Sequence, residues 1–355
     1  MRNASYSSLD KLLHRLALGS RSIAEMAFDV DQSVSRYAVA DAIGGEHVFV
    51  SGLARSGTTI LMRRLHESGR FRSLTYRDMP FVLAPTLWGK INGIARANDE
   101  PVERAHADGI FISADSPESL DEVFWRVFDG DRYIKDDRLV PHIPDPELVA
   151  RFQRYVASIL NSARSSESRY LSKNNNNILR LGMLSAAFPA AVFLIPFRDP
   201  IRHAGSLMQQ DRRFVALQNA DPFVLTYMNR LAHHEFGKGH RPFVFSDDTM
   251  NPYSRDEVDY WLFLWCEVYD RLLDTAPDGA IFVCYEDLCS DPAVWRRLAR
   301  RCGIEVDAAA EHPFTIGRTG PDATAEPDLL GRAAALYEDL RARSRKSLSG
   351  DSTDV

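Results

Sequence analysis

The feature that most limits the possible folds is a glycine-rich turn at residues 52–59, which reads G-L-A-R-S-G-T-T. It follows a short apolar segment around residues 47–51 and precedes a stretch with helical periodicity from Thr58 to about Ser68. The frame G-x-x-x-x-G between a strand and a helix is typical of loops whose backbone N–H groups surround a phosphate. The turn therefore predicts an anion site at the start of a helix in an α/β fold.

The basic residue of this turn stands in an unusual place. Thr58 occupies the position where a nucleotide triphosphatase has its lysine, and the cation is Arg55, three residues earlier. Such a loop can hold phosphate-like oxygens, but it gives little support to magnesium–ATP chemistry. An ordinary glycine turn is the alternative reading.

A second motif begins where a predicted buried strand ends. Residues 191–197 are almost all apolar, Arg198 follows them directly, and Ser206 stands eight residues later on a predicted helix. Ligands of open α/β sheets bind outside the carboxyl ends of the strands, so an arginine fork and a hydroxyl there would suit a phosphate group. The alternative is that Arg198 pairs with a carboxylate such as Asp199.

The order of elements predicts the fold class. Strand and helix signals alternate along the chain, which favours an α/β fold with a doubly wound, mostly parallel sheet flanked by helices. We expect one large domain of P-loop-like nucleotide-binding type with helical and loop insertions. The predicted N-terminal segment covers residues 1–45 and is helical over 5–43. The predicted α/β domain covers residues 46–310 and contains acceptor-site insertions at 76–145 and 237–256. The predicted C-terminal segment covers residues 311–355, with a final helix at 329–343 and a frayed end.

Three motifs together resemble the sulfotransferases that use 3′-phosphoadenosine 5′-phosphosulfate (PAPS). In that family a turn of the type P-[KR]-S-G-T-T holds the 5′-phosphosulfate, and an arginine with a serine eight residues on holds the 3′-phosphate. Here Ala54 replaces the usual proline. The third match is V-C-Y-E-D-L at residues 283–288, whose Tyr285 would lie by the adenine. Arg55 and the S-K-N sequence around Lys173 are closer to the bacterial and tyrosylprotein-sulfotransferase-like branch.

The resemblance implies roles for individual residues. Arg55 and Lys173 would neutralise the transferring sulfuryl group, although Lys173 could also be a solvated side chain. The cofactor-binding residues that it implies are Arg55, Ser56, Gly57, Thr58, Thr59, Arg198, Ser206, Tyr285 and Arg318. No metal is expected.

The general base is open between several residues. Asp78, after a predicted strand at residues 73–75, is the first choice, and His106 is the second. Glu118 and Glu122 are third. The segment that holds these two glutamates could equally be the first turn of a helix that Ser116 caps.

The function that follows is in-line transfer of a sulfuryl group from PAPS to a hydroxyl, less readily an amine, of a small-molecule, lipid or carbohydrate acceptor. The alternative is a P-loop kinase or nucleotide triphosphatase, with Thr59 binding magnesium and Asp199 as its second carboxylate ligand. A third possibility is a binding module that keeps the fold without catalysis.

Composition excludes several other classes. A formal net charge of −6 over 355 residues argues against a nucleic-acid partner. No apolar stretch is long enough to form a transmembrane segment, and the N-terminus does not read as a secretory signal. The 4 cysteines form no C-x-x-C pair, so we expect reduced thiols in a cytoplasmic protein.

Overall fold

A parallel sheet forms the centre of the protein. The computed structural model describes residues 17–92, 102–103, 111–112, 116–163, 168–246, 250–307, 314–315 and 324–349. The sheet has five strands, all parallel, in the order β2-β5-β1-β6-β7. Their bounds are β1 (Val48–Val50), β2 (Phe71–Arg72), β5 (Arg169–Lys173), β6 (Val192–Phe197) and β7 (Ile281–Cys284). β3 (Val102–Glu103) and β4 (Phe111–Ile112) form a separate antiparallel pair.

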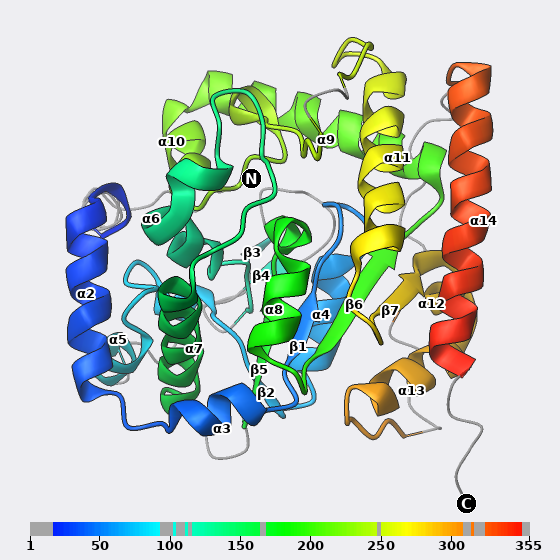
Figure 1. Cartoon of the computed structure of the whole chain (residues 1–355). Coiled ribbons are helices and arrows are strands. Elements are labelled where there is room, and N and C mark those ends of the chain that lie inside the picture. Colours follow the sequence, from blue (N-terminus) through cyan, green and yellow to red (C-terminus); the bar gives the residue numbers. More distant parts are fainter. Residues whose placement is uncertain are drawn as a thin grey trace, which may run out of the picture.

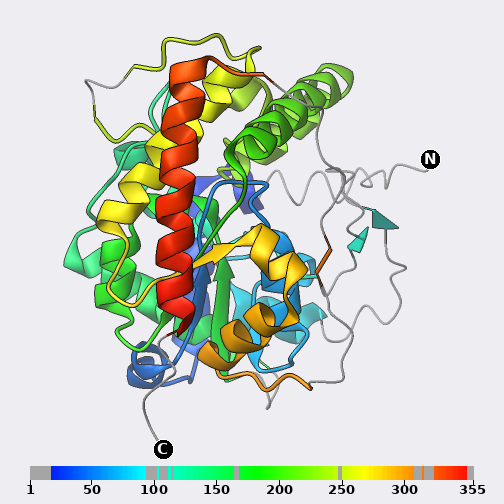
Figure 2. The same cartoon turned by 90° about the vertical axis from the view of Figure 1, so that its right-hand side faces the viewer.

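Helices cover both faces of this sheet (Figure 1; Figure 2). Val48 and Val50 lie in one apolar cluster with residues of α4 (Thr58–His66) and α13 (Pro292–Arg301). Phe49, between them, lies in the opposite cluster and stacks on Phe193 with ring centroids 5.2 Å apart. That cluster includes residues of α7 (Pro146–Asn161), α8 (Leu181–Ala187), α9 (Pro200–Ala220) and α11 (Val258–Thr275). Burial on both faces explains why the strands are almost wholly apolar, and it confirms the predicted doubly wound α/β fold.

The remaining helices surround this core. They are α2 (Arg21–Val34), α3 (Val39–Gly44), α5 (Pro85–Asn92), α6 (Glu122–Tyr133), α10 (Pro222–Arg230), α12 (Tyr285–Ser290) and α14 (Pro327–Ser349), with 3₁₀ turns η1 (Tyr76–Asp78), η2 (Asn175–Leu179) and η3 (Gly237–Gly239). α14 runs beside α11 in both views (Figure 1; Figure 2).

An Asp-Pro pair begins several of the helices. In each case proline occupies the first helical position, where its missing N–H is not needed, and the preceding aspartate accepts a hydrogen bond from a backbone N–H of the first turn. These helices are α7, α9, α10 and α13, capped by Asp145, Asp199, Asp221 and Asp291. The starts of the helices that frame the site are therefore fixed by local sequence.

Three predicted segments differ from the structure. The helix expected over residues 5–43 is interrupted within its described part, because Ser35 is extended and separates α2 from α3. The strand expected at 73–75 lies at Phe71–Arg72 instead. The final helix does not fray at its predicted end but continues to Ser349, since Leu340 and Leu348 are buried against the core. Tertiary packing extends that helix beyond what its polar sequence suggests.

Candidate functional site

The glycine-rich turn leaves β1 and enters α4, as predicted. Arg55 and Gly57 both have left-handed backbone conformations, with φ of 71° and 98°. The Ser56 hydroxyl donates a hydrogen bond of 2.8 Å to the carbonyl of Leu53 and closes the turn. α4 begins at Thr58 without a side-chain cap, so no capping side chain uses its first N–H groups. A left-handed arginine costs about 1 kcal/mol or more, a strain that is concentrated at ligand sites.

Tyr285 packs directly on this turn. A Cβ atom at Gly57 would lie 2.6 Å from Cδ2 of the Tyr285 ring, so only glycine fits there. The Tyr285 hydroxyl donates to the carbonyl of Thr315 at 3.0 Å. The third sequence motif therefore lies against the first, at the carboxyl end of β7.

Arg198 and Ser206 also reach the turn. Nη1 of Arg198 donates to the carbonyl of Arg55 at 3.4 Å, and its guanidinium carbon lies 5.6 Å from the centre of the Tyr285 ring. Nε of Arg55 donates to the Ser206 hydroxyl at 3.4 Å. The structure thus brings together Arg55, Gly57, Arg198, Ser206 and Tyr285, which come from three separate strand ends.

The carboxylate next to Arg198 is used elsewhere. Asp199 caps α9, because its side chain accepts a hydrogen bond of 2.9 Å from the backbone N–H of Arg202. Nε of Arg198 is buried without a hydrogen-bond partner, and no carboxylate of the described ranges forms an ion pair with this guanidinium. Asp199 therefore leaves Arg198 available to an anion.

Lys173 ends β5 beside the turn. It stands opposite Val50 in the parallel register and is only 8% exposed. Within the part of the chain that the structure describes, its ammonium has neither a hydrogen bond nor an ion pair. A cation without a counter-ion on a largely buried side chain makes this position suited to an anionic ligand.

A buried polar cluster contacts the end of β5 on the face of the sheet opposite α4. The carboxylate of Asp121 accepts hydrogen bonds from the Ser172 hydroxyl at 2.6 Å, the Tyr170 hydroxyl at 3.0 Å and the Asn174 amide at 3.3 Å. Burial raises the pKa of Asp121 to about 6, against the opposing effect of the Ser172 hydrogen bond. Because side chains alternate along a strand, these contacts on Ser172 and Asn174 direct Lys173 to the face that carries α4.

Glu122 is occupied within the same cluster. Its two carboxylate oxygens accept hydrogen bonds of 2.9 and 3.0 Å from the guanidinium of Arg180, and others from Tyr133 and from Asn174. Arg180 in turn donates to Nε2 of His142 at 3.0 Å. This third-choice base is therefore a buried ion-pair partner. The helix start expected at Ser116 is also wrong, since α6 begins at Glu122.

The first-choice base Asp78 lies in a closed environment. It is 5% exposed, and Oδ1 accepts a hydrogen bond of 2.6 Å from Arg72. Oδ2 accepts from the backbone N–H and the hydroxyl of Thr75 at 2.7 and 3.1 Å. Both oxygens thus hold the turn after β2 in place.

Glu118 also uses both of its carboxylate oxygens. Oε1 of Glu118 accepts a hydrogen bond from the backbone N–H of Ser119 at 2.9 Å, and Oε2 accepts one from the Tyr76 hydroxyl at 3.1 Å. His106 and Arg318 lie outside the described residues.

His203 is a site residue that the sequence did not indicate. It stands on the first turn of α9, is fully buried, and its Nε2 lies 2.8 Å from the carbonyl of Ala54. Burial, helped by the nearby charge of Arg198, lowers the pKa of His203 to about 3, so the ring is neutral and donates its Nε2 proton. It thereby fixes the carbonyl just before Arg55.

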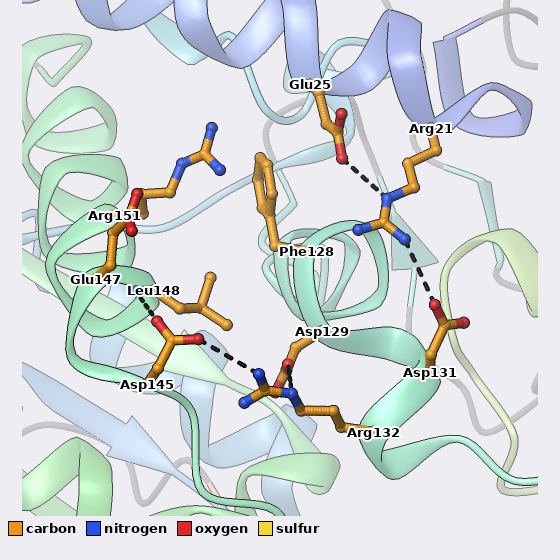
Figure 3. A pocket seen from close by; sticks show the side chains of 10 residues that line it. All are labelled: Arg21, Glu25, Phe128, Asp129, Asp131, Arg132, Asp145, Glu147, Leu148 and Arg151. Atoms are coloured by element: carbon orange, nitrogen blue, oxygen red, sulfur yellow. Dashed lines mark hydrogen bonds and ion pairs between the residues drawn. The ribbon is translucent and has the colours of Figure 1, made fainter.

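A cavity of about 390 Å³ lies away from the strand ends, between α2, α6 and α7 (Figure 3). Its charged side chains are largely neutralised in pairs: Arg21 contacts Glu25 and Asp131, and Arg132 contacts Asp129 and Asp145. None of its lining residues comes from the glycine-rich turn or the sheet. We therefore place the candidate site at the turn.

Comparison with known proteins also points to the glycine-rich turn and the strand ends beside it. A model of the sulfotransferase family matches residues 47–308. The chain belongs to the sulfotransferase family. The matched range includes the turn, Lys173, Arg198, Ser206 and Tyr285. The comparison with curated proteins gave no match.

Solved sulfotransferase structures match this chain at low sequence identity. STF1 from Mycobacterium tuberculosis H37Rv is 15% identical, with a TM-score of 0.50, over 96% of this chain and 88% of that chain. STF9 from Mycobacterium avium is 16% identical, with a TM-score of 0.49, over 92% and 83%. The enzyme from Alicyclobacillus acidocaldarius is 16% identical, with a TM-score of 0.35, over 86% and 96%. The likeness to STF1 shows a shared fold.

Within the described ranges, none of the helices combines the length and the apolar character needed to cross a membrane.

Proposed function

We propose that this sulfotransferase takes its sulfuryl group from PAPS and transfers it to a hydroxyl-bearing acceptor. The observation that carries the proposal is the pair of cations Arg198, which contacts the glycine-rich turn, and Lys173, which ends the strand beside β1; neither has a carboxylate partner in the described chain. An anion with more than one charged group would supply the missing partners.

The residues present fit such a nucleotide. The buried unpartnered Nε of Arg198 suits a phosphate oxygen, and the uncapped start of α4 at Thr58 and Thr59 suits another. The Tyr285 ring offers a flat face beside Arg198. We assign the 3′-phosphate to Arg198 and Ser206, the 5′-phosphosulfate to the turn, and the adenine to Tyr285.

Alignment of the reactants and stabilisation of negative charge would account for most of the catalysis. PAPS, as the donor substrate, supplies an activated sulfuryl group. By analogy with phosphoryl transfer, the protein needs mainly to align the two reactants and to stabilise negative charge. We assign this stabilisation to Arg55, Lys173 and the backbone N–H groups of the turn, which lie in a largely buried setting where each charge acts strongly.

The acceptor class is a hydroxyl compound, whether small molecule, lipid or carbohydrate. Incubating the protein with PAPS and a cell extract, and searching by mass spectrometry for compounds that gain one sulfonate group, identifies it. The protein without PAPS and PAPS without the protein serve as controls.

We expect the product nucleotide 3′-phosphoadenosine 5′-phosphate (PAP) to bind without magnesium. At a concentration 100 times its Kd, it should stabilise the fold by about 2.7 kcal/mol, because it binds only the native state. Thermal unfolding in EDTA measures this. Stabilisation by magnesium–ATP but not by PAP would instead support the kinase alternative, which the use of Asp199 as a helix cap disfavours.

Replacing Arg198 by alanine should weaken PAP binding roughly 100-fold, since about two charge-assisted hydrogen bonds are lost. Adenosine 5′-monophosphate, which lacks the 3′-phosphate, should bind almost as before. Calorimetry with both nucleotides measures the difference, and Arg202→Ala on the exposed side of α9 is the matched control. Equal losses for both nucleotides would mean that Arg198 is structural.

A further inference from the structure

The turn after α10 is attached to the turn that follows Lys173. The Asn176 amide donates to the carbonyl of Ala232 at 3.2 Å, and the Asn175 amide donates to Oε1 of Glu235 at 2.9 Å. Ala232 has a left-handed backbone with φ of 54°, which is unfavourable for a residue other than glycine. These contacts hold a strained turn in place and bring Glu235 close to the end of β5.

Glu235 also lies beside the glycine-rich turn. It lines a cavity of about 20 Å³ together with Leu53 and Ala54, the two residues before Arg55. The other charged or titratable side chains that line this cavity are His240 and Arg241, and the rest of its lining is apolar. The half-buried carboxylate of Glu235 therefore stands between the two segments that carry Arg55 and Lys173.

The oxygens of Glu235 differ from those of the carboxylates that the sequence put forward. Asp78, Glu118 and Glu122 each use both carboxylate oxygens in hydrogen bonds. Glu235 uses Oε1 for Asn175, while Oε2 has neither a hydrogen bond nor an ion pair with any described residue. A general base must have an oxygen free to accept the proton of the reacting group.

We propose that Glu235 is the general base of the transfer, an assignment that rests on the function proposed above. The acceptor hydroxyl gives its proton to Oε2 of Glu235. Its oxygen forms a bond to sulfur while the bond between sulfur and the 5′-phosphate oxygen breaks, and that electron pair leaves with PAP. The products are the sulfated acceptor, PAP and a protonated Glu235, which then loses its proton to water.

The surroundings of Glu235 suit this task. The Asn175 hydrogen bond fixes one oxygen and so orients the other. Asn175 comes two residues after Lys173, so the side chain that orients the base follows closely on the cation that would stabilise the transferring group. The end of β5 therefore takes part in positioning both groups.

Glu235→Gln tests the assignment. Glutamine keeps the size and can still accept the Asn175 hydrogen bond, but it is not a base. With radiolabelled PAPS and a cell extract as the acceptor mixture, we expect the initial rate of sulfuryl transfer to fall roughly 10²–10⁴-fold. The Kd for PAP, measured by calorimetry, should change less than about twofold, because a base contributes to proton removal and not to nucleotide binding.

The control carries the same change on an exposed carboxylate. Glu257 accepts a hydrogen bond from the backbone of Ser254 and is exposed, so Glu257→Gln should transfer at the wild-type rate.

Glu235→Asp distinguishes a lost base from a folding defect. It keeps a carboxylate on a side chain one carbon shorter, so it should retain more activity than Glu235→Gln. The assignment is overturned if Glu235→Gln keeps more than about a tenth of the rate, or if Asp78→Asn abolishes transfer with normal stability and PAP binding. A wild-type protein that neither binds PAP nor transfers would overturn the proposed function itself, and this assignment with it.

Discussion

Lowering the pH from 7 to 5 should remove about 8 kcal/mol from the free energy of unfolding. The cause is a set of buried histidines that stay neutral in the folded protein. Burial lowers the pKa to about 4 at His47 and His234, and to about 3 at His142, His203 and His240. The unfolded chain protonates these rings below about pH 6.5, whereas the folded chain does not.

The sign follows from the number of bound protons. Between pH 6.5 and about 4 the unfolded state binds more protons at these rings, so stability falls as the pH falls, by about 2 kcal/mol per histidine at pH 5. Asp121 acts in the opposite direction. Burial raises the pKa of Asp121 to about 6, so as the pH falls the folded state binds this proton before the unfolded state does. This raises the free energy of unfolding by about 1.4 kcal/mol at pH 5 and offsets part of the loss.

Urea unfolding at half-unit pH steps from 7 to 5 measures the effect. His142→Gln should reduce the slope of the free energy of unfolding against pH by about one proton, roughly 1.4 kcal/mol per pH unit. The Nδ1 of His142 lies 2.5 Å from Asp129 and its Nε2 accepts from Arg180, so the neutral ring protonated on Nδ1 satisfies both neighbours. A free energy that stays level down to pH 5 would contradict the prediction.

Glu122→Ala should destabilise the fold by about 3–5 kcal/mol, because it leaves the Arg180 guanidinium buried without a counter-charge. Both side chains are almost wholly buried, at 1% and 0% exposure. Burial alone would raise the pKa of Glu122, but Arg180 outweighs it and holds that pKa below its ordinary value. The rings of Trp125 and Tyr133 lie 4.7 and 4.9 Å from the guanidinium and cannot replace the carboxylate.

A double-mutant cycle separates the ion pair from the packing. Arg180→Ala should be similarly harmful, while the double variant should cost clearly less than the two single effects together, since neither charge is then left alone. Denaturant unfolding gives all three values. Additive losses would show that the two side chains do not act as a pair.

The parts of the fold that the sequence predicted depend on local signals. The glycine-rich turn and the apolar run before Arg198 each act within a few residues, so their positions could be read directly. Such signals also placed Arg55, Arg198 and Tyr285 at strand ends, and Ser206 on the helix that follows one of them, where parallel topology brings these residues together.

The parts that could not be predicted depend on distant partners. Glu122 looks like an acidic first-turn residue, and only the fold shows that Arg180, 58 positions later, binds it. Asp78 looks like a free carboxylate after a strand until Arg72 is seen beside it. Glu235 lies in the turn that follows α10, and nothing in the local sequence shows that this turn comes back to Asn175.

The strand order sets when the anion site can come into existence as the ribosome makes the chain. β1 emerges first, but its two neighbours are β5 and β6, whose paired residues begin at Leu171 and Val192. The strand that carries the glycine-rich turn must therefore wait for more than a hundred residues of synthesis, about 10 s or longer at ordinary translation rates, with its apolar side chains uncovered. A chain released before that point has an unpaired central strand, which makes it prone to aggregate.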